Sequence, residues 1–158
     1  GPTALSAFDA ALMAAGVTHW NLLHLSSVVP PGSEIIEEPI TTPETEFGQR
    51  RYVVIAQRYA LKPGEQAWAG LGWTQDETRR GLFVEIVGPS EEQVRSDIEH
   101  TLTSMKARRA FPLGPNCSKV IGATCTDMPV CALVIAVFPG SGPWPAEQHG
   151  PPESQGRG

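Results

Sequence analysis

The chain lacks several features that mark common classes of protein. Its 158 residues include three cysteines, Cys117, Cys125 and Cys131, and none of them forms a Cys-x-x-Cys pair. No apolar run approaches the roughly 18 residues of a membrane span, and no charged-then-apolar signal segment opens the sequence. We therefore expect neither disulfides nor a zinc site. The cysteines predict reduced thiols and a cytoplasmic protein.

The chain also lacks an excess of positive charge. Its 12 basic residues against 17 acidic ones give a net charge of −5, which argues against nucleic acid or an anionic membrane as the main partner and suits a small cationic molecule better. Nucleotide-binding, zinc-protease and serine-hydrolase motifs are missing. The four histidines have no metal-ligand spacing, so we expect no metal site.

The residues that are present predict one globular α+β domain. A content of 41% hydrophobic residues is enough to form a core. Residues 139–158 are half Gly or Pro and predict a disordered tail after a domain at 1–138. Apolar periodicity and capping signals predict the order α-β-β-β-β-α-β-β, and hence a layered αββα sandwich. The elements expected are helices at 4–16 and from Ser90, and strands at 20–29, 52–59, 66–73, 82–87, 118–124 and 130–138.

Two short patterns stand out within these elements. Gly70 and Gly72 lie in the strand at 66–73, which predicts that another element packs very close to that backbone. Ser26 and Ser27 lie in an apolar strand just before the rigid run Pro30-Pro31-Gly32. By composition alone, the serine pair and the prolines are most simply a turn.

The serine pair also permits self-cleavage. The Ser27 hydroxyl can attack the Ser26 carbonyl, which turns the peptide into an ester. Loss of the Cα proton and β-elimination would then free the upstream piece, and hydrolysis would leave a pyruvoyl group on the downstream piece. Asn21 could donate a hydrogen bond to the Ser26 carbonyl as a small oxyanion hole, and the two prolines would keep the strained geometry fixed.

The sequence resembles the pyruvoyl-dependent arginine decarboxylase family over roughly residues 1–138. The similar segments are Leu5-Ser-Ala-Phe8-Asp9-Ala-Ala-Leu12-Met-Ala-Ala-Gly16, then Asn21-Leu22, then Ser26-Ser27-Val-Val-Pro30-Pro31-Gly32, and finally Gly81-Leu82-Phe83-Val84-Glu85.

This resemblance implies a self-cleaved enzyme that converts L-arginine to agmatine and CO2, a step of polyamine biosynthesis, through a Schiff base on a pyruvoyl cofactor derived from Ser27. It implies a small fragment 1–26, a large fragment 27–138 followed by the tail, and homotrimers of cleaved pairs that stack into hexamers in some members. The implied roles are cleavage between Ser26 and Ser27, help in processing from Asn21, proton donation by Glu85, and substrate binding by Asp9, by Leu5 and by the backbone at Thr18 and Trp20. We expect Glu85 to be buried between Val84 and Ile86, where it would keep a proton for the substrate carbanion.

Two departures from the family pattern leave alternatives open. The run Val17-Thr18-His19-Trp20 is bulkier than the small turn expected before Asn21, so lysine, ornithine or S-adenosylmethionine are alternative substrates. An unprocessed, non-catalytic trimeric homologue is a further alternative, although the presence of Asn21, Ser27 and Glu85 together favours activity. The chain also begins inside the family's N-terminal region, so we expect one sheet edge to lack a strand.

Overall fold

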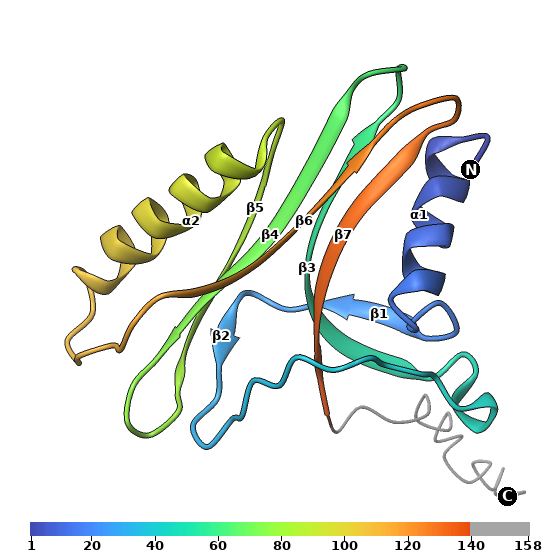
Figure 1. The fold of residues 1–158 in the computed structure, drawn as a ribbon. Helices are drawn as coiled ribbons and strands as arrows, with labels where there is room; N and C mark the ends of the chain where they lie inside the picture. Colours follow the sequence, from blue (N-terminus) through green and yellow to red (C-terminus); the bar gives the residue numbers. More distant parts are fainter. Residues whose placement is uncertain (140–158) are drawn as a thin grey trace, which may run out of the picture.

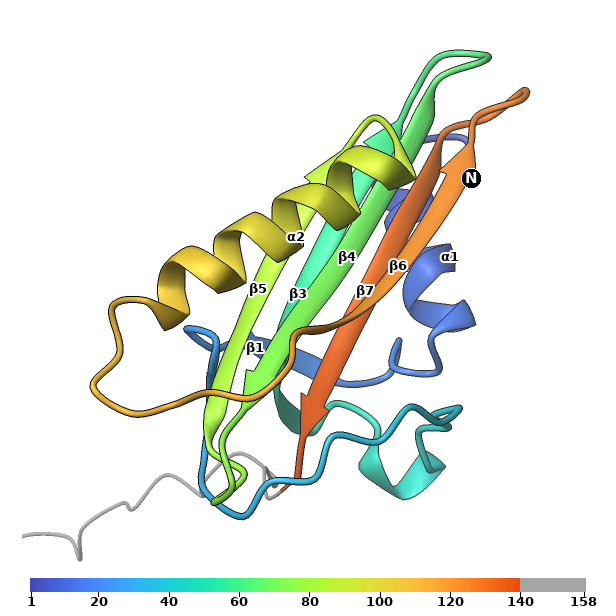
Figure 2. The ribbon, with the colours of Figure 1, turned by 60° about the vertical axis from the view of Figure 1, so that its left-hand side comes forward.

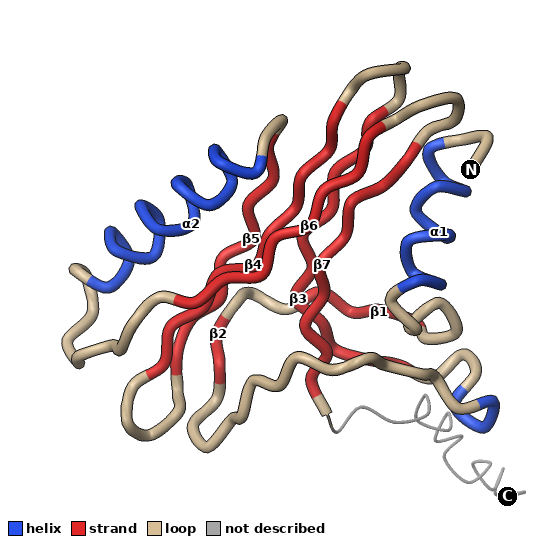
Figure 3. Tube along the Cα trace, viewed as in Figure 1, coloured by secondary structure: helices blue, strands red, loops and turns tan. Residues whose placement is uncertain are grey.

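The computed structural model describes residues 1–139; the predicted tail otherwise lies outside the described residues. Within this range the chain forms two α-helices, one short 3-10 helix and seven strands, as Figures 1 and 3 show. Their bounds are α1 Ala4–Ala14, β1 Asn21–His24, β2 Val28–Val29, η1 Glu44–Glu46, β3 Arg50–Ala60, β4 Gln66–Gln75, β5 Gly81–Gly88, α2 Glu91–Lys106, β6 Cys117–Thr124 and β7 Val130–Phe138. The predicted α+β class is confirmed.

The strands form two sheets. One has the order β1-β3-β7, and the other has the order β2-β5-β4-β6. β1 pairs with β3 in parallel, from Asn21 opposite Arg50 to His24 opposite Val53, whereas the other strand pairs are antiparallel. The single strand expected at 20–29 is wrong, because its two halves belong to different sheets. The chain crosses between the sheets at residues 25–27.

The main core lies between the two sheets. Val54 and Ala56 of β3 contact a cluster that includes Leu71 of β4 and Phe83 of β5. The ring of Phe83 meets that of Phe138 edge to face, with ring centres 6.2 Å apart. The two helices cover the outer faces, since α1 packs on β7 and α2 packs on β4, β5 and β6 (Figures 1 and 2).

Helix α2 fits closely because β4 offers no side chain at two positions beneath it. Ser90 caps its start by accepting a hydrogen bond from the Gln93 amide at 3.3 Å. Its inner stripe, Val94, Ile98 and Leu102, is fully buried. A Cβ atom at Gly70 would lie 2.8 Å from a Val94 methyl group, and one at Gly72 would overlap Ile98. The close approach predicted from the two glycines is confirmed.

The three cysteines are free thiols, with Cys117 exposed and Cys125 buried. In the described part of the chain, no helix has the length and apolar character needed to cross a membrane.

The fit of α2 onto β4 can be tested at Gly72. We expect Gly72→Ala to lower the free energy of unfolding by about 1–3 kcal/mol, because the added methyl group overpacks the site. Ile98→Ala should also destabilise the protein, by about 2–5 kcal/mol, because it leaves a cavity. The double variant should lose less than the sum, since Ile98→Ala removes the atoms that clash. Urea unfolding at one protein concentration measures this, and strictly additive losses would contradict the packing.

Candidate active site

The Ser26–Ser27 bond lies where the chain changes sheets. The Leu25 amide still donates to the Val53 carbonyl of β3 at 2.9 Å, so the first sheet holds the chain up to that residue. Two residues after Leu25, the Ser27 carbonyl accepts a hydrogen bond from the Phe83 amide of β5 at 2.8 Å. The predicted cleavage point therefore occupies the short segment between two fixed strands.

Ser27 adopts a left-handed backbone conformation, with φ of +52°. This conformation costs an L-residue other than glycine about 1–2 kcal/mol, and among the described non-glycine residues only Arg79 shares it. β2 begins at the next residue, where Val28 pairs with Leu82. The strands on either side thus impose an unfavourable conformation on the residue expected to react.

The Ser27 hydroxyl lies against a carboxylate. Its Oγ donates to Glu85, with both carboxylate oxygens 2.7 Å away. Glu85 stands opposite Leu71 on β4, so its side chain points to the same side of the sheet as the core between the sheets. The sequence separation of Ser27 and Glu85 is 58 residues, and the fold places them in direct contact. This carboxylate can accept the proton of the hydroxyl.

Glu85 is exposed in the single chain, so its expected burial between Val84 and Ile86 is wrong. Those two neighbours point toward α2, where both contact its apolar stripe. Glu85 points to the opposite face of the sheet. Phe83, two residues before it on that face, is only 4% exposed, whereas the Glu85 side chain is open to solvent. Val87, two residues further along the same face, is also exposed, at 41%. The site is therefore an open carboxylate with an apolar margin.

A second group of predicted site residues lies on α1 and in the turn that follows it. Thr18 Oγ1 donates to Asp9 Oδ1 at 3.1 Å. Leu5 and Met13 lie four residues before and after Asp9, which puts all three on one side of the helix. Leu5 is 75% exposed and Met13 is 62% exposed. Asp9 thus stands between two large apolar side chains that no other part of the described chain covers.

Trp20 belongs to the same end of the molecule and is fixed by two charged residues. Its Nε1 donates to Glu46 Oε2 at 3.0 Å, and Arg51 donates to the same oxygen at 2.6 Å. The Arg51 guanidinium lies 4.7 Å from the centre of the Trp20 ring, within the range of a cation–π contact. The 3-10 helix that carries Glu46 therefore holds the residue just before β1.

Asn21 does not reach the Ser26 carbonyl in the single chain. Its Nδ2 donates instead to the Gly48 carbonyl at 2.6 Å, so the expected hydrogen bond along one strand is wrong. The physical reason is that Asn21 begins β1 in one sheet, whereas Ser27 marks the passage to the other. Any part that Asn21 plays in processing stays a prediction.

The structure thus brings the site residues together as two groups and does not join them. Asp9, Thr18, Trp20 and Asn21 lie on α1, in the turn after it and at the start of β1, whereas Ser27 lies just before β2 and Glu85 lies in β5. Two contacts could not be read from the sequence: the Phe83 amide that holds Ser27, and the Thr18 hydroxyl on Asp9. Both depend on segments that meet only in the folded chain.

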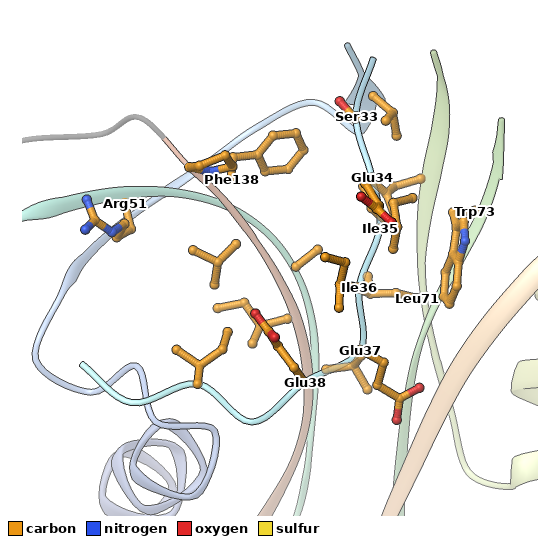
Figure 4. Close-up of a pocket in the computed structure, with 18 of the residues that line it drawn as sticks. Ser33, Glu34, Ile35, Ile36, Glu37, Glu38, Arg51, Leu71, Trp73 and Phe138 are labelled. Atoms are coloured by element: carbon orange, nitrogen blue, oxygen red, sulfur yellow. The ribbon is translucent and has the colours of Figure 1, made fainter. Parts of the chain in front are cut away.

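A long connection follows the reactive segment and covers a cavity. Residues 30–43, here called the strap, have no regular structure (Figure 3). The strap is tied to the β4–β5 turn, since the Gly32 amide donates to Thr78 and Gln75 donates to the Ser33 carbonyl. Between the strap and the sheets lies a cavity of about 1010 Å³ (Figure 4). Its lining is mainly apolar and includes Ile35, Leu71, Trp73, Phe83 and Phe138.

Comparison with known proteins gives one consistent result. The family model described as pyruvoyl-dependent arginine decarboxylase matches residues 1–139. The chain is 33% identical over 148 residues to the pyruvoyl-dependent arginine decarboxylase of Thermococcus kodakarensis, covering 88% of each chain. It is 46% identical over 115 residues to that of Methanothermobacter thermautotrophicus, covering 72% of this chain and 73% of the relative.

The match to a third relative is shorter. The pyruvoyl-dependent arginine decarboxylase of Halobacterium salinarum is 35% identical over 105 residues, which is 65% of this chain and 62% of the relative. The chain therefore spans less than two thirds of that relative's length.

The strain at Ser27 can be measured with two variants that both lack the hydroxyl. Ser27→Gly should unfold with a free energy about 1 kcal/mol higher than Ser27→Ala, because glycine adopts positive φ without a steric penalty. Thermal unfolding of both intact chains at equal concentration gives the difference. Equal stability of the two variants, or a more stable alanine variant, would show that no strain is stored there. The matched pair Val28→Gly and Val28→Ala, at a residue of normal strand conformation, should give the opposite order.

Proposed function

The chain belongs to the pyruvoyl-dependent arginine decarboxylase family, and we propose that it cuts itself between Ser26 and Ser27 and then decarboxylates L-arginine to agmatine. The observation that supports this most directly is the contact between the Ser27 hydroxyl and both oxygens of Glu85 at 2.7 Å. A cytoplasmic location, as the cysteines predict, belongs to the same proposal.

Self-cleavage begins at Ser27 Oγ. Glu85 takes the hydroxyl proton while the oxygen attacks the Ser26 carbonyl carbon. The proton then passes to the peptide nitrogen as it leaves that carbon, so that an ester and a free amine replace the amide. Removal of the Ser27 Cα proton then breaks the bond from Cβ to the ester oxygen. This releases Ser26 as a free carboxylate. Hydrolysis of the resulting dehydroalanine consumes one water, releases one ammonia and leaves the pyruvoyl group.

The residues around Ser27 fit the group that this reaction leaves. The Phe83 amide holds the Ser27 carbonyl at 2.8 Å, and β2 pairs with β5 immediately afterwards, so the new end of the large fragment stays where the serine stood. A pyruvoyl ketone condenses with an α-amine and withdraws the electron pair that CO2 loss releases. Glu85, within reach of this position, would give its proton to the substrate α-carbon.

The two groups of site residues suit a shared site between copies of the chain. Asp9 lies between exposed Leu5 and Met13, and Glu85 lies beside exposed Val87. Apolar margins of this kind around a charged group favour burial against a partner. In the proposed homotrimer of cleaved pairs, built from αββα sandwiches, Asp9 of one subunit receives the cationic end of a substrate whose α-carbon meets the Glu85 of its neighbour. Asn21 would then act on the neighbour's Ser26 carbonyl.

Fragment masses test the processing step. Wild-type protein should separate under denaturing conditions into fragments 1–26 and 27–158, the larger one lighter by one ammonia than the unmodified sequence. Ser27→Ala should stay a single chain. Purified wild type should release CO2 from arginine faster than from lysine or ornithine, and should form agmatine. An intact wild-type chain of 17.0 kDa, or no CO2 from arginine, would contradict the proposal.

Mixed oligomers test the shared site. Asp9→Asn and Glu85→Gln should each lower kcat/KM for arginine by about 100-fold or more, through loss of the cation's partner and of the proton donor. When the two variants are co-expressed with different tags and mixed trimers are purified, about a third of the wild-type activity should return, because one of the three interfaces in each mixed trimer pairs two intact halves. Oligomers purified in the same way from two differently tagged Glu85→Gln chains serve as the control. If the mixture is no more active than this control, the whole site belongs to one chain.

A further inference from the structure

We propose that the Thr18 hydroxyl is a positioning group that fixes the Asp9 carboxylate in the orientation a guanidinium requires, and so favours arginine over substrates with an ammonium end. This inference rests on the proposed function, in which Asp9 receives the cationic end of the substrate. It assigns a role to the Thr18 side chain, whereas the sequence resemblance concerns the backbone at this position.

The hydrogen bond from Thr18 is what holds the Asp9 carboxylate in place. Asp9 is exposed on the outer side of α1, and its Oδ1 accepts from Thr18 Oγ1 at 3.1 Å. Within residues 1–139 the Asp9 carboxylate has no other hydrogen bond or ion pair. An exposed aspartate without such a partner samples several side-chain orientations. Thr18 therefore selects the one that is populated.

The turn after α1 holds Thr18 firmly enough to do this. The helix ends in a Schellman motif, in which the Gly16 amide donates to Met13 and the Val17 amide donates to Leu12, each at 3.0 Å. Gly16 has φ of +74°, which glycine adopts freely. Val17 is fully buried. The chain thus turns back beside α1 at a fixed angle.

The strap secures this turn from the other side. The Thr42 hydroxyl donates to the Gly16 carbonyl at 2.6 Å, and a Cβ atom at Gly16 would overlap the Ile40 carbonyl. The turn that carries Thr18 is therefore enclosed between α1 and the strap. A substrate would meet a hydroxyl that is already ordered and would not bear the entropy cost of ordering it.

A fixed carboxylate matters more to a guanidinium than to an ammonium. An ionised carboxylate offers about four acceptor positions, so one hydrogen bond from Thr18 leaves about three. A guanidinium uses two parallel N–H groups that need both oxygens in one plane, whereas an ammonium is a point charge that can approach either oxygen. Holding the plane of the Asp9 carboxylate therefore favours the guanidinium selectively.

The test compares Thr18→Val, which keeps the branched shape and loses the hydroxyl, with Thr18→Ser, which keeps the hydroxyl. In processed enzyme, Thr18→Val should raise KM for arginine by about 10-fold or more, the effect of losing a hydrogen bond to a charged group, with little change in kcat. The dissociation constant of agmatine, measured by calorimetry, should rise by the same factor. That of 1,5-diaminopentane should change less than about 2-fold, since an ammonium needs no fixed plane. Thr18→Ser should restore wild-type values.

The outcomes separate this inference from the function on which it rests. If wild type binds agmatine and decarboxylates arginine, but Thr18→Val weakens both ligands equally or neither, the positioning role is wrong. A fall in kcat, in self-cleavage or in melting temperature would show instead that Thr18 acts through the fold. If wild-type protein neither decarboxylates arginine nor binds agmatine, the proposed function fails and takes the positioning role with it.

Discussion

The hydrogen bond between Ser27 Oγ and the Glu85 carboxylate depends on a single topological constraint, the passage of the chain from one sheet to the other between β1 and β2. β1 is bound to β3, and β2 is bound to β5, so the few residues between them have almost no freedom. Ser27 takes a left-handed conformation because this connection is so short. The same constraint aims its hydroxyl at β5, where Glu85 stands on the face that points toward the other sheet.

The division between the sheets also explains how a cleaved chain would stay together. Residues 1–26 include α1, which packs on β7, and β1, which pairs with β3. The N-terminal amine of Gly1 donates to the Pro129 carbonyl at 3.1 Å. Residues after the cut are held by β2 and by the strap. Each side of the Ser26–Ser27 bond has its own attachments, so breaking the bond would release strain and leave the two sheets in contact.

Local signals in the sequence predicted most of the elements, and the parts that they missed arise from contacts between distant segments. The cap at Ser90 and the apolar stripe of α2 located that helix, and Gly70 and Gly72 predicted its close contact with β4. Residues 20–29 read as one strand because apolar residues recur along the whole segment and no Gly or Pro interrupts it, and only the pairing with β3 and β5 divides it. The site residues came from the resemblance to a family. The resemblance did not predict how these residues group in space. The hydrogen bonds from Asn21 to Gly48 and from Thr18 to Asp9 depend on turns whose geometry is set by tertiary packing.

The parallel pairing of β1 with β3 has a consequence for the lifetime of the mature protein. A parallel pair needs a long connection, and here that connection runs through the bond that the proposed reaction cuts. Once cut, an unfolded molecule is two separate peptides. Their return to this arrangement would be a second-order reaction that depends on concentration, and the lost serine could not be made again. The active form would then be reached once, by folding of the intact precursor. Its persistence would be governed by an unfolding rate, as kinetic stability, and not by a reversible equilibrium.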